Sequence, residues 1–314
     1  RGYKPEICGG YVCISDLIAS AVKFLILSMD VWRIKFQMNW KLLKSMLWYA
    51  LPLLVAGLAG MVNELLDRIL IKQILWSEHG EEYALSQLGI YGACYKISII
   101  ITLFIQAFRY AAEPFFFNHA DNKEAPALFA KIMHYFFVFN IVILVAVVLN
   151  TALISDIFIQ NPNYKEALYV LPILLFAKLF YGVYVNLSIW FKLTDQTLFG
   201  SYFAGAGALI TLIGNLFLIP ILGFMGSALT SLICYLTMSV LCYGLGKKHF
   251  PVPYKFLPLF VHLLVAVLIV VSSFQFNFEN NLYQYGMGLT ITLVYGGAIF
   301  LYEWKKLRHK PMDV

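Results

Sequence analysis

The sequence predicts an all-α fold, a polytopic transmembrane helix bundle of about nine spans. Of the 314 residues, 61% are hydrophobic and only 13% are charged. A soluble protein of this length could not bury so much apolar surface. Aromatic residues make up 17% of the chain, as expected where Trp and Tyr line the two boundaries between lipid and water. The net charge of +6 then bears on topology and lipid headgroups, and no basic, aromatic-interleaved patch predicts nucleic-acid binding.

Apolar runs close to the roughly 20 residues that a helix needs to cross hydrocarbon recur along the whole chain. The connections between them are short and leave no room for a soluble catalytic domain. We expect spans at 11–29, 48–71, 88–111, 132–154, 168–190, 198–220, 224–246, 257–275 and 284–303.

The connections between these runs alternate in charge. Lys and Arg gather in the first, third, fifth and seventh connections and in the tail, whereas the other connections are mostly acidic. By the positive-inside rule, the basic connections and the C-terminus are expected in the cytoplasm. The basic set is Arg33, Lys35, Lys41, Lys44, Lys123, Lys131, Lys192, Lys247, Lys248, Lys255, Lys305, Lys306, Arg308 and Lys310, and the acidic set is Glu78, Glu81, Glu82, Asp156, Glu166 and Glu279.

The segment 30–46 is amphipathic. Trp32 and Trp40 fall on one helical face, and Arg33 and Lys41 fall on another. This pattern is typical of a helix that lies in the cytoplasmic interface with its cations toward anionic lipid. A basic linker that only follows the topology rule explains it equally well.

Four parts of the chain are therefore expected. Residues 1–29 would be the last helix of a first bundle, 30–46 a cytoplasmic amphipathic linker, 47–246 a second six-helix bundle, and 247–314 two additional helices with a basic cytoplasmic tail. The chain starts at Arg1 with no initiator Met and no signal-peptide pattern, and its first apolar run begins almost at once. The first bundle is therefore expected to be largely missing.

Polar residues gather in the outer half of the apolar run 51–72, at Asn63, Glu64, Asp67 and Arg68. Charges at that depth cost roughly 2.5–3.5 kcal/mol each on insertion scales, so they should be paired or face a wet cavity. At 1.5 Å per residue, Asp67 and Arg68 would lie about 12 Å beyond the midplane. We expect them to line an external vestibule or gate, with Asn63 nearer the centre.

Lys178 lies near the middle of its span, too far from either end to reach water by snorkelling. No acid lies three or four residues away, so its partner must be another helix, water or substrate. Tyr181 shares its helical face one turn on, and Asn186 lies below. Two interpretations stay open: a cavity-facing role in substrate binding, or an interhelical ion pair with Asp16, Glu64 or Asp67.

Cations outnumber acids within the predicted spans, which favours a cavity for an anionic group such as a phosphate or pyrophosphate. Lys96 lies about a third of the way in from outside, and Asn215 is a polar residue in the outer half of its span. The candidate substrate-binding residues are Lys178, Arg68, Asn63, Asp67, Lys96, Tyr181, Asn186 and Asn215.

Small residues form helical stripes in 200–228, among them Gly207 and Gly214. Such stripes let helices approach closely in lipid, so we expect tight packing in this region. Residues from Pro220 to Gly223 are expected to make a tight external turn into the next span.

No catalytic or metal site is expected, and the chain is not predicted to be an enzyme. The six histidines are scattered singly along the sequence. His262 lies inside a predicted span, and a lone buried histidine is more often a hydrogen-bonded packing residue than a ligand of a metal or substrate. The five cysteines show no paired spacing. A polymerase or membrane acyltransferase would show a large external loop with paired Arg, or a catalytic His, and a non-transporting scaffold would need no charge at mid-depth.

Two stretches resemble one family. LPLLVAGLAGMVNELLDRILI is similar to the seventh helix of polysaccharide-biosynthesis flippases, with a Pro near its start and an Asn-x-x-x-Asp-Arg ending, here Asn63, Asp67 and Arg68. NLFLIPILGFMGSALTSLICY resembles the turn between their eleventh and twelfth helices, Asn-x-x-x-Ile-Pro-x-x-Gly-x-x-Gly-Ser/Ala-Ala. Both motifs occur in the right order and distance, so the spans would be helices six to fourteen of a fourteen-helix transporter.

The family belongs to the multidrug/oligosaccharidyl-lipid/polysaccharide exporter superfamily. The resemblance implies alternating-access flipping of a polyprenyl-pyrophosphate-linked oligosaccharide across the bacterial cytoplasmic (inner) membrane, for surface polysaccharide or lipopolysaccharide assembly. It also implies a cationic central cavity for the pyrophosphate or acidic sugars. The partners would be the lipid-linked oligosaccharide, membrane lipids and other polysaccharide-assembly proteins, with no cofactor and with Na⁺ or H⁺ open as coupling ion. The alternative is a cation-coupled multidrug extrusion antiporter, which would use a membrane-embedded acid such as Asp16, Glu64 or Asp67.

Overall fold

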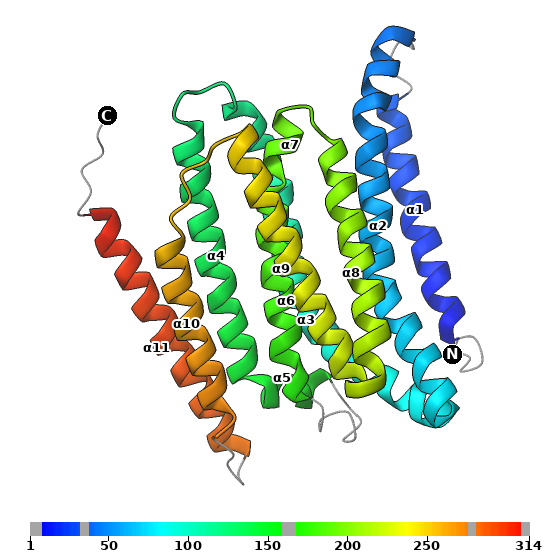
Figure 1. Cartoon of the computed structure of the whole chain (residues 1–314), viewed down its shortest axis with the longest axis vertical. Helices are drawn as coiled ribbons and strands as arrows, with labels where there is room; N and C mark the ends of the chain where they lie inside the picture. The colour runs from blue at the N-terminus through cyan, green and yellow to red at the C-terminus, as the bar shows by residue number, and fades with distance from the viewer. Residues whose placement is uncertain (1–7, 32–37, 159–167, 276–280, 309–314) are drawn as a thin grey trace. The chain divides into compact units, whose positions relative to one another are not determined.

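The structure is a computed structural model that describes residues 8–31, 38–158, 168–275 and 281–308. Within these ranges all regular secondary structure is helical, which confirms the predicted all-α class. The chain divides into two compact units, residues 1–48 and 49–314. The helices are α1 (Cys8–Val31), α2 (Trp40–His79), α3 (Glu81–His119), α4 (Ala125–Leu149), α5 (Thr151–Phe158), the 3-10 helix η3 (Leu168–Val170), α6 (Leu171–Leu187), α7 (Ile189–Leu193), α8 (Leu198–Leu222), α9 (Phe224–His249), α10 (Phe256–Ser273) and α11 (Asn281–Arg308) (Figure 1).

Eight helical stretches of the described chain are long and apolar enough to cross a membrane. They are α2, α3, α4, the stretch from η3 to α7, α8, α9, α10, and α11 from Tyr283 on. Large apolar side chains are exposed on these helices, such as Leu54, Leu103 and Phe217, which suits a lipid environment. The chain is thus a multi-pass membrane protein. The remaining predicted span, 11–29, is the first along the chain and coincides with α1, which is not among these eight stretches.

α2 extends beyond the span expected at 48–71 in both directions. Asn39 caps its start, because the Asn39 side-chain oxygen accepts hydrogen bonds from the backbone N–H groups of Lys41 and Leu42, both at 3.1 Å. The later part of the segment predicted as an amphipathic linker therefore opens α2 from Trp40 without a break. Residues 32–37 of that segment lie outside the described residues.

Two of the expected spans are interrupted. The span at 132–154 ends as α4 at Leu149, and the Asn150 amide then donates to the Ala146 carbonyl oxygen at 2.8 Å and to the Thr292 hydroxyl of α11 at 3.0 Å. The stretch at 168–190 breaks at Ser188, between α6 and α7. A polar side chain that bonds back to the preceding turn competes with the next helical hydrogen bond, so such residues favour helix ends.

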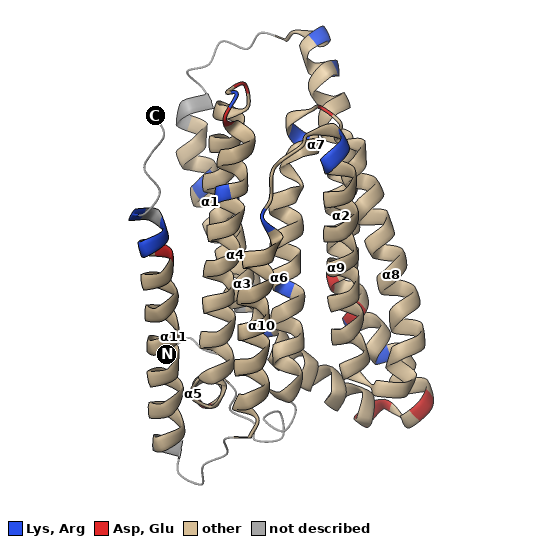
Figure 2. Ribbon diagram, turned by 60° about the vertical axis from the view of Figure 1, so that its left-hand side comes forward, with Lys and Arg blue, Asp and Glu red and all other residues tan. Residues whose placement is uncertain are grey.

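Within the unit of residues 49–314, α6 packs against α3, α4 and α9. α8 packs on α9, and α10 and α11 pack on α4. The long helices run up and down in alternation, so their connections fall at two opposite ends (Figure 1). Figure 2 shows basic and acidic residues side by side near the starts of α4 and α8, Lys and Arg at the end of α11, and acidic residues at the turn between α2 and α3.

The contact between α8 and α9 depends on glycine. A Cβ atom on Gly207 would lie 2.6 Å from the Met238 sulfur, and one on Gly214 would lie 2.7 Å from a Thr230 methyl carbon. The predicted tight packing of this region is therefore observed. The turn itself is shorter than expected, because Pro220 still belongs to α8 and the chain reverses at Gly223, where φ is +59°.

Candidate functional site

Asp67 on α2 is buried, with 3% of its surface exposed, where four helices meet. Its carboxylate accepts hydrogen bonds from the Tyr91 hydroxyl of α3 at 2.8 Å, the Asn215 amide of α8 at 2.8 Å and the Ser231 hydroxyl of α9 at 2.7 Å. A carboxylate is costly to bury unless its lone pairs are satisfied, and hydrogen bonds to a charged acceptor are the strong ones. These donors thus hold a carboxylate inside an apolar bundle.

Lys178 on α6 is equally buried, with 3% of its side chain exposed. Its Nζ atom donates to the Glu64 carboxylate of α2 at 3.0 Å and to the Tyr95 hydroxyl of α3 at 2.9 Å. The rings of Tyr95, Tyr181 and Tyr235 surround the ammonium, with centroids 4.6, 5.8 and 5.9 Å away. A cation is attracted to the faces of aromatic rings at these distances, more strongly where water is excluded.

The two buried charges belong to one network. Glu64, Asp67 and Arg68 follow one another along α2, and the Arg68 guanidinium lies 4.5 Å from the centroid of the Tyr95 ring. The Tyr91 and Tyr95 rings, one turn apart on α3, have centroids 6.2 Å apart. Together Glu64, Asp67, Arg68, Tyr91, Tyr95, Lys178, Asn215 and Ser231 are called the charged cluster below.

Of the protein partners considered for Lys178, the structure shows Glu64. The role of Lys178 in substrate binding stays a prediction. Asp67, which was expected to line an external vestibule or gate, is buried, because side chains from three other helices close over its carboxylate. Arg68 is partly buried. Asn215 bonds directly to Asp67, and Tyr181 lies against Lys178.

Three predicted residues make none of the contacts described for the charged cluster. Lys96 is exposed and therefore lies on another face of α3 than the buried Tyr91. Asn186 on α6 is buried at 4% exposure. Asn63 is also buried, beside Gly207, and its side-chain oxygen finds no hydrogen-bond partner within the described residues.

Sequence reasoning missed Tyr91, Tyr95 and Ser231. A signal for the first two was present, because Tyr91, Tyr95 and Ser98 recur at helical spacing within an otherwise apolar run. Ser231 gave no such signal, since a lone Ser is common in membrane helices where it bonds within its own helix.

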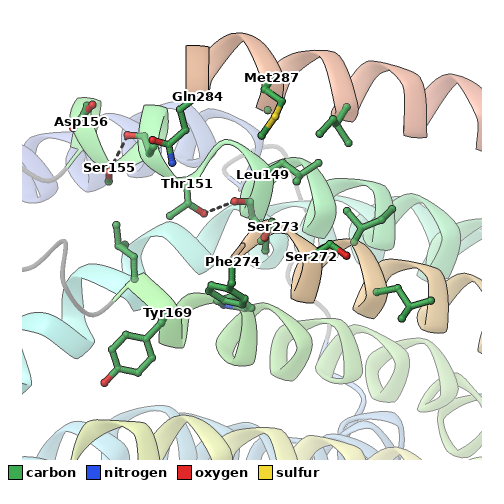
Figure 3. Close-up of a pocket in the computed structure, with 18 of the residues that line it drawn as sticks. Leu149, Thr151, Ser155, Asp156, Tyr169, Ser272, Ser273, Phe274, Gln284 and Met287 are labelled. Atoms are coloured by element: carbon green, nitrogen blue, oxygen red, sulfur yellow. Dashed lines mark hydrogen bonds between the residues drawn. The ribbon is translucent and has the colours of Figure 1, made fainter. Parts of the chain in front are cut away.

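A separate pocket of about 850 Å³ lies between α4, α5, α6, α10 and α11. Figure 3 shows Thr151, Ser155, Gln284 and Phe274 around it, and none of the predicted site residues lines it. Its wall mixes apolar side chains with hydroxyl and amide groups, a composition that suits part of a lipid or sugar as well as water. The pocket is thus distinct from the charged cluster.

The comparisons with known proteins do not assign the chain to a family. No family model matches the chain, and neither a curated protein nor a solved structure matches it.

Proposed function

We propose that the protein is a transporter that flips a polyprenyl-pyrophosphate-linked oligosaccharide across the bacterial cytoplasmic membrane by alternating access, for surface polysaccharide assembly. The observation that carries this proposal is the ion pair between Lys178 and Glu64 inside a membrane helix bundle. Charged side chains inside a membrane bundle are costly, commonly mark substrate or ion pathways, and are weak evidence of a purely stabilising role.

The two partners of this pair differ in exposure. The Lys178 side chain is 3% exposed, whereas the Glu64 side chain is 40% exposed. Glu64 is therefore the partner that can leave, and an incoming anion can take its place beside the ammonium. A pyrophosphate oxygen offers the same charge-assisted hydrogen bond as a carboxylate oxygen.

Arg68 provides a second cation for the same anion. Its guanidinium and the Lys178 ammonium contact the same Tyr95 ring, at 4.5 and 4.6 Å from the centroid. The Arg68 Nε atom is buried and has no hydrogen-bond partner within the described residues. A guanidinium with an unfilled donor matches a phosphate well, because its N–H groups are arranged for paired oxygens.

In this proposal the basic ends of the helices and the C-terminus face the cytoplasm, as the positive-inside rule expects. Exchange of Glu64 for the pyrophosphate would separate α2 from α6 at the charged cluster and loosen one face of the bundle. Such a differential contact in two states is what alternating access requires.

A cation-coupled multidrug antiporter is the second candidate, and Asp67 favours it. Within the described part of the chain the Asp67 carboxylate is held by neutral donors alone, and it can exchange them for a proton or Na⁺, whereas Glu64 is already paired with Lys178. Transport of a cationic drug analogue that fails in Asp67→Asn and persists in Lys178→Ala would support this second candidate over the flippase.

The test of the flippase proposal measures surface polysaccharide and the lipid-linked oligosaccharide retained in the inner leaflet of the source cell. We expect Lys178→Ala and Arg68→Gln to lower export at least about tenfold, because each removes a contact to a charged group worth about 1.5–3 kcal/mol. Lys131→Ala, which removes an exposed cation of α4, should leave export unchanged. Normal export by Lys178→Ala at wild-type protein levels would contradict the proposal.

A further inference from the structure

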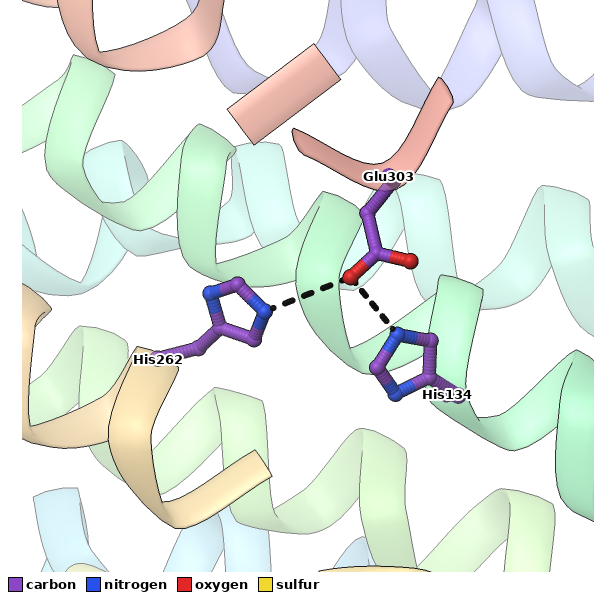
Figure 4. A group of neighbouring side chains, drawn as sticks. All are labelled: His134, His262 and Glu303. Atoms are coloured by element: carbon purple, nitrogen blue, oxygen red, sulfur yellow. Dashed lines mark ion pairs between the residues drawn. The ribbon is translucent and has the colours of Figure 1, made fainter. Parts of the chain in front are cut away.

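His134, His262 and Glu303 converge from three helices, although they are far apart in the sequence. They lie on α4, α10 and α11 respectively, and their ligand atoms all lie within 4.8 Å of one another (Figure 4). The His134 Nε2 atom is 3.1 Å from the Glu303 Oε1 atom, and the His262 Nε2 atom is 3.5 Å from the same oxygen. His134 and His262, which are isolated from each other in the sequence, thus lie together with Glu303 in the fold.

The group is enclosed and its polar atoms are poorly satisfied. The side chains of His134, His262 and Glu303 are 15%, 12% and 8% exposed. The His134 Nε2 atom and both Glu303 carboxylate oxygens have no hydrogen bond of acceptable geometry within the described residues. A buried polar atom in that condition calls for an explanation, and an ion between the three side chains supplies one.

Apolar residues of α10 lie on the same helical face as His262. On α10, His262 continues the inward face that buries Leu259, Ala266 and Val270. Ionisable side chains between membrane helices cost free energy unless they are paired or bind a ligand, so the three residues are a candidate functional site.

The distances fit a transition-metal ion. A tetrahedral ion with His nitrogen and carboxylate oxygen ligands at about 2.1 Å sets its ligand atoms about 3.4 Å apart. The separations of the two histidine nitrogens from Glu303 Oε1, 3.1 and 3.5 Å, lie on either side of that value, and all three ligand atoms lie within 4.8 Å of one another. Two neutral imidazoles and one carboxylate form a donor set typical of Zn²⁺, with a fourth position left for water.

We propose that His134, His262 and Glu303 bind a divalent transition-metal ion of the Zn²⁺ class. The ion joins α10 and α11 to α4, on which both helices pack, and so fixes the two C-terminal helices to the rest of their unit. Binding of this kind stabilises the folded state in proportion to the logarithm of the free metal concentration. The proposal does not depend on what the protein transports.

Lys306 gives the site a competing partner. Its Nζ atom lies 3.6 Å from the Glu303 Oε1 atom, and its side chain is 43% exposed. The ammonium can therefore swing into water when the metal binds, at the cost of its ion pair with Glu303. Removal of this cation should tighten metal binding, because a positive charge beside a metal site opposes a second one.

The experiment titrates Zn²⁺ into the purified full chain in detergent, after treatment with a chelator and with an affinity tag that contains no histidine. We expect one Zn²⁺ per chain and a higher melting temperature on addition of metal. H134Q, H262Q and E303Q should each weaken binding by at least about 100-fold, since even loss of a residue that only supports a ligand costs about 10–100-fold. K306Q should bind Zn²⁺ several-fold more tightly than the wild type. Co²⁺ in place of Zn²⁺ should give the visible absorption of a four-coordinate ion, lost in the three ligand variants.

H79Q is the matched control, because His79 is an exposed histidine 3.9 Å from the Glu78 carboxylate and lies outside the group. It should bind Zn²⁺ as the wild type does. The proposal is overturned if the wild type binds no stoichiometric Zn²⁺, or if H134Q and H262Q bind as tightly as H79Q. Neither readout involves oligosaccharide export, so a failure here leaves the flippase proposal standing, and the reverse also holds.

Discussion

At the residue scale, Lys178 and Asp67 keep their charges inside the bundle by different means. Lys178 has an ionic partner, Glu64, and three tyrosine rings. Among the described residues, Asp67 accepts hydrogen bonds from neutral donors alone, on Tyr91, Asn215 and Ser231. In the proposed function the first arrangement exchanges one anion for another, whereas the second joins four helices around one carboxylate.

Asp67→Asn should destabilise the protein by about 1.5–3 kcal/mol, the range for a hydrogen bond to a charged group. The new side chain keeps only one acceptor oxygen, so it cannot accept from Asn215 on one side and from Tyr91 and Ser231 on the other, as the two carboxylate oxygens do. The melting temperature of the purified protein in detergent measures the loss. Glu82→Gln, at an exposed acid of α3, is the control, and an equal shift in both variants would contradict the role given to Asp67.

At the element scale, the α8–α9 hairpin shows how close two membrane helices can lie when glycine lines the contact. A Cβ atom on Gly226 would lie 2.3 Å from the Leu218 carbonyl oxygen, which is backbone and cannot move aside. The same pair of helices carries Asn215 and Ser231, so the hairpin also sets the distance between two of the donors to Asp67.

Gly226→Ala should therefore lower the stability by about 1–3 kcal/mol or more, the usual cost of overpacking. Gly244, on the same helix, has open space around it, and Gly244→Ala should be neutral or stabilising by up to about 1 kcal/mol because Ala favours the helix. Thermal unfolding of the two variants side by side makes the comparison. A Gly226→Ala protein as stable as Gly244→Ala would show that the hairpin is looser than described.

At the scale of the whole molecule, the sign of the charge at the connections underlies the expected orientation of the helices in the membrane. The basic residues used for the expected orientation include Lys123, Lys192 and Lys255, at or beside the connections that lead into α4, α8 and α10, whereas acids occupy the turn between α2 and α3. Asp121, Glu124 and Asp195 accompany the first two of these cations. This alternation sets the expected orientation in the membrane.

Single cysteines test that orientation in a variant whose native cysteines are replaced by alanine. Glu82→Cys should react with a membrane-impermeant maleimide on intact cells, whereas Asn122→Cys and Lys248→Cys should react only after the membrane is permeabilised. All three positions are exposed at helix ends or connections. Labelling of Lys248→Cys on intact cells would contradict the expected orientation and indicate the opposite one.

Much of the fold could be predicted from the sequence, because a membrane helix is recognised by a long apolar run and by the charges of the connections that flank it. The charged cluster was readable only in part. Asp67 and Lys178 stand out in apolar surroundings, and the need for a partner on another helix followed from the absence of a neighbouring acid. Tertiary packing alone could show that Glu64, not Asp67, is that partner, since both lie on α2 within one turn.

The rest depends on contacts that sequence spacing does not encode. His134, His262 and Glu303 meet only because α10 and α11 both pack on α4. The break after Leu149 was likewise hidden, because Asn150 leaves the helical pattern to bond to Thr292 of a distant helix.

The central claim is that Lys178 binds the transported anion and that Glu64 only stands in for it. The double variant Lys178→Glu with Glu64→Lys keeps an ion pair between α6 and α2 but moves the cation to the partner that is 40% exposed. Melting temperature and surface polysaccharide are measured on the same variant. We predict that the double variant recovers most of the stability lost by Lys178→Glu alone and still fails to export. Recovery of both stability and export would contradict the claim, because the pair would then be structural and the position of the cation immaterial.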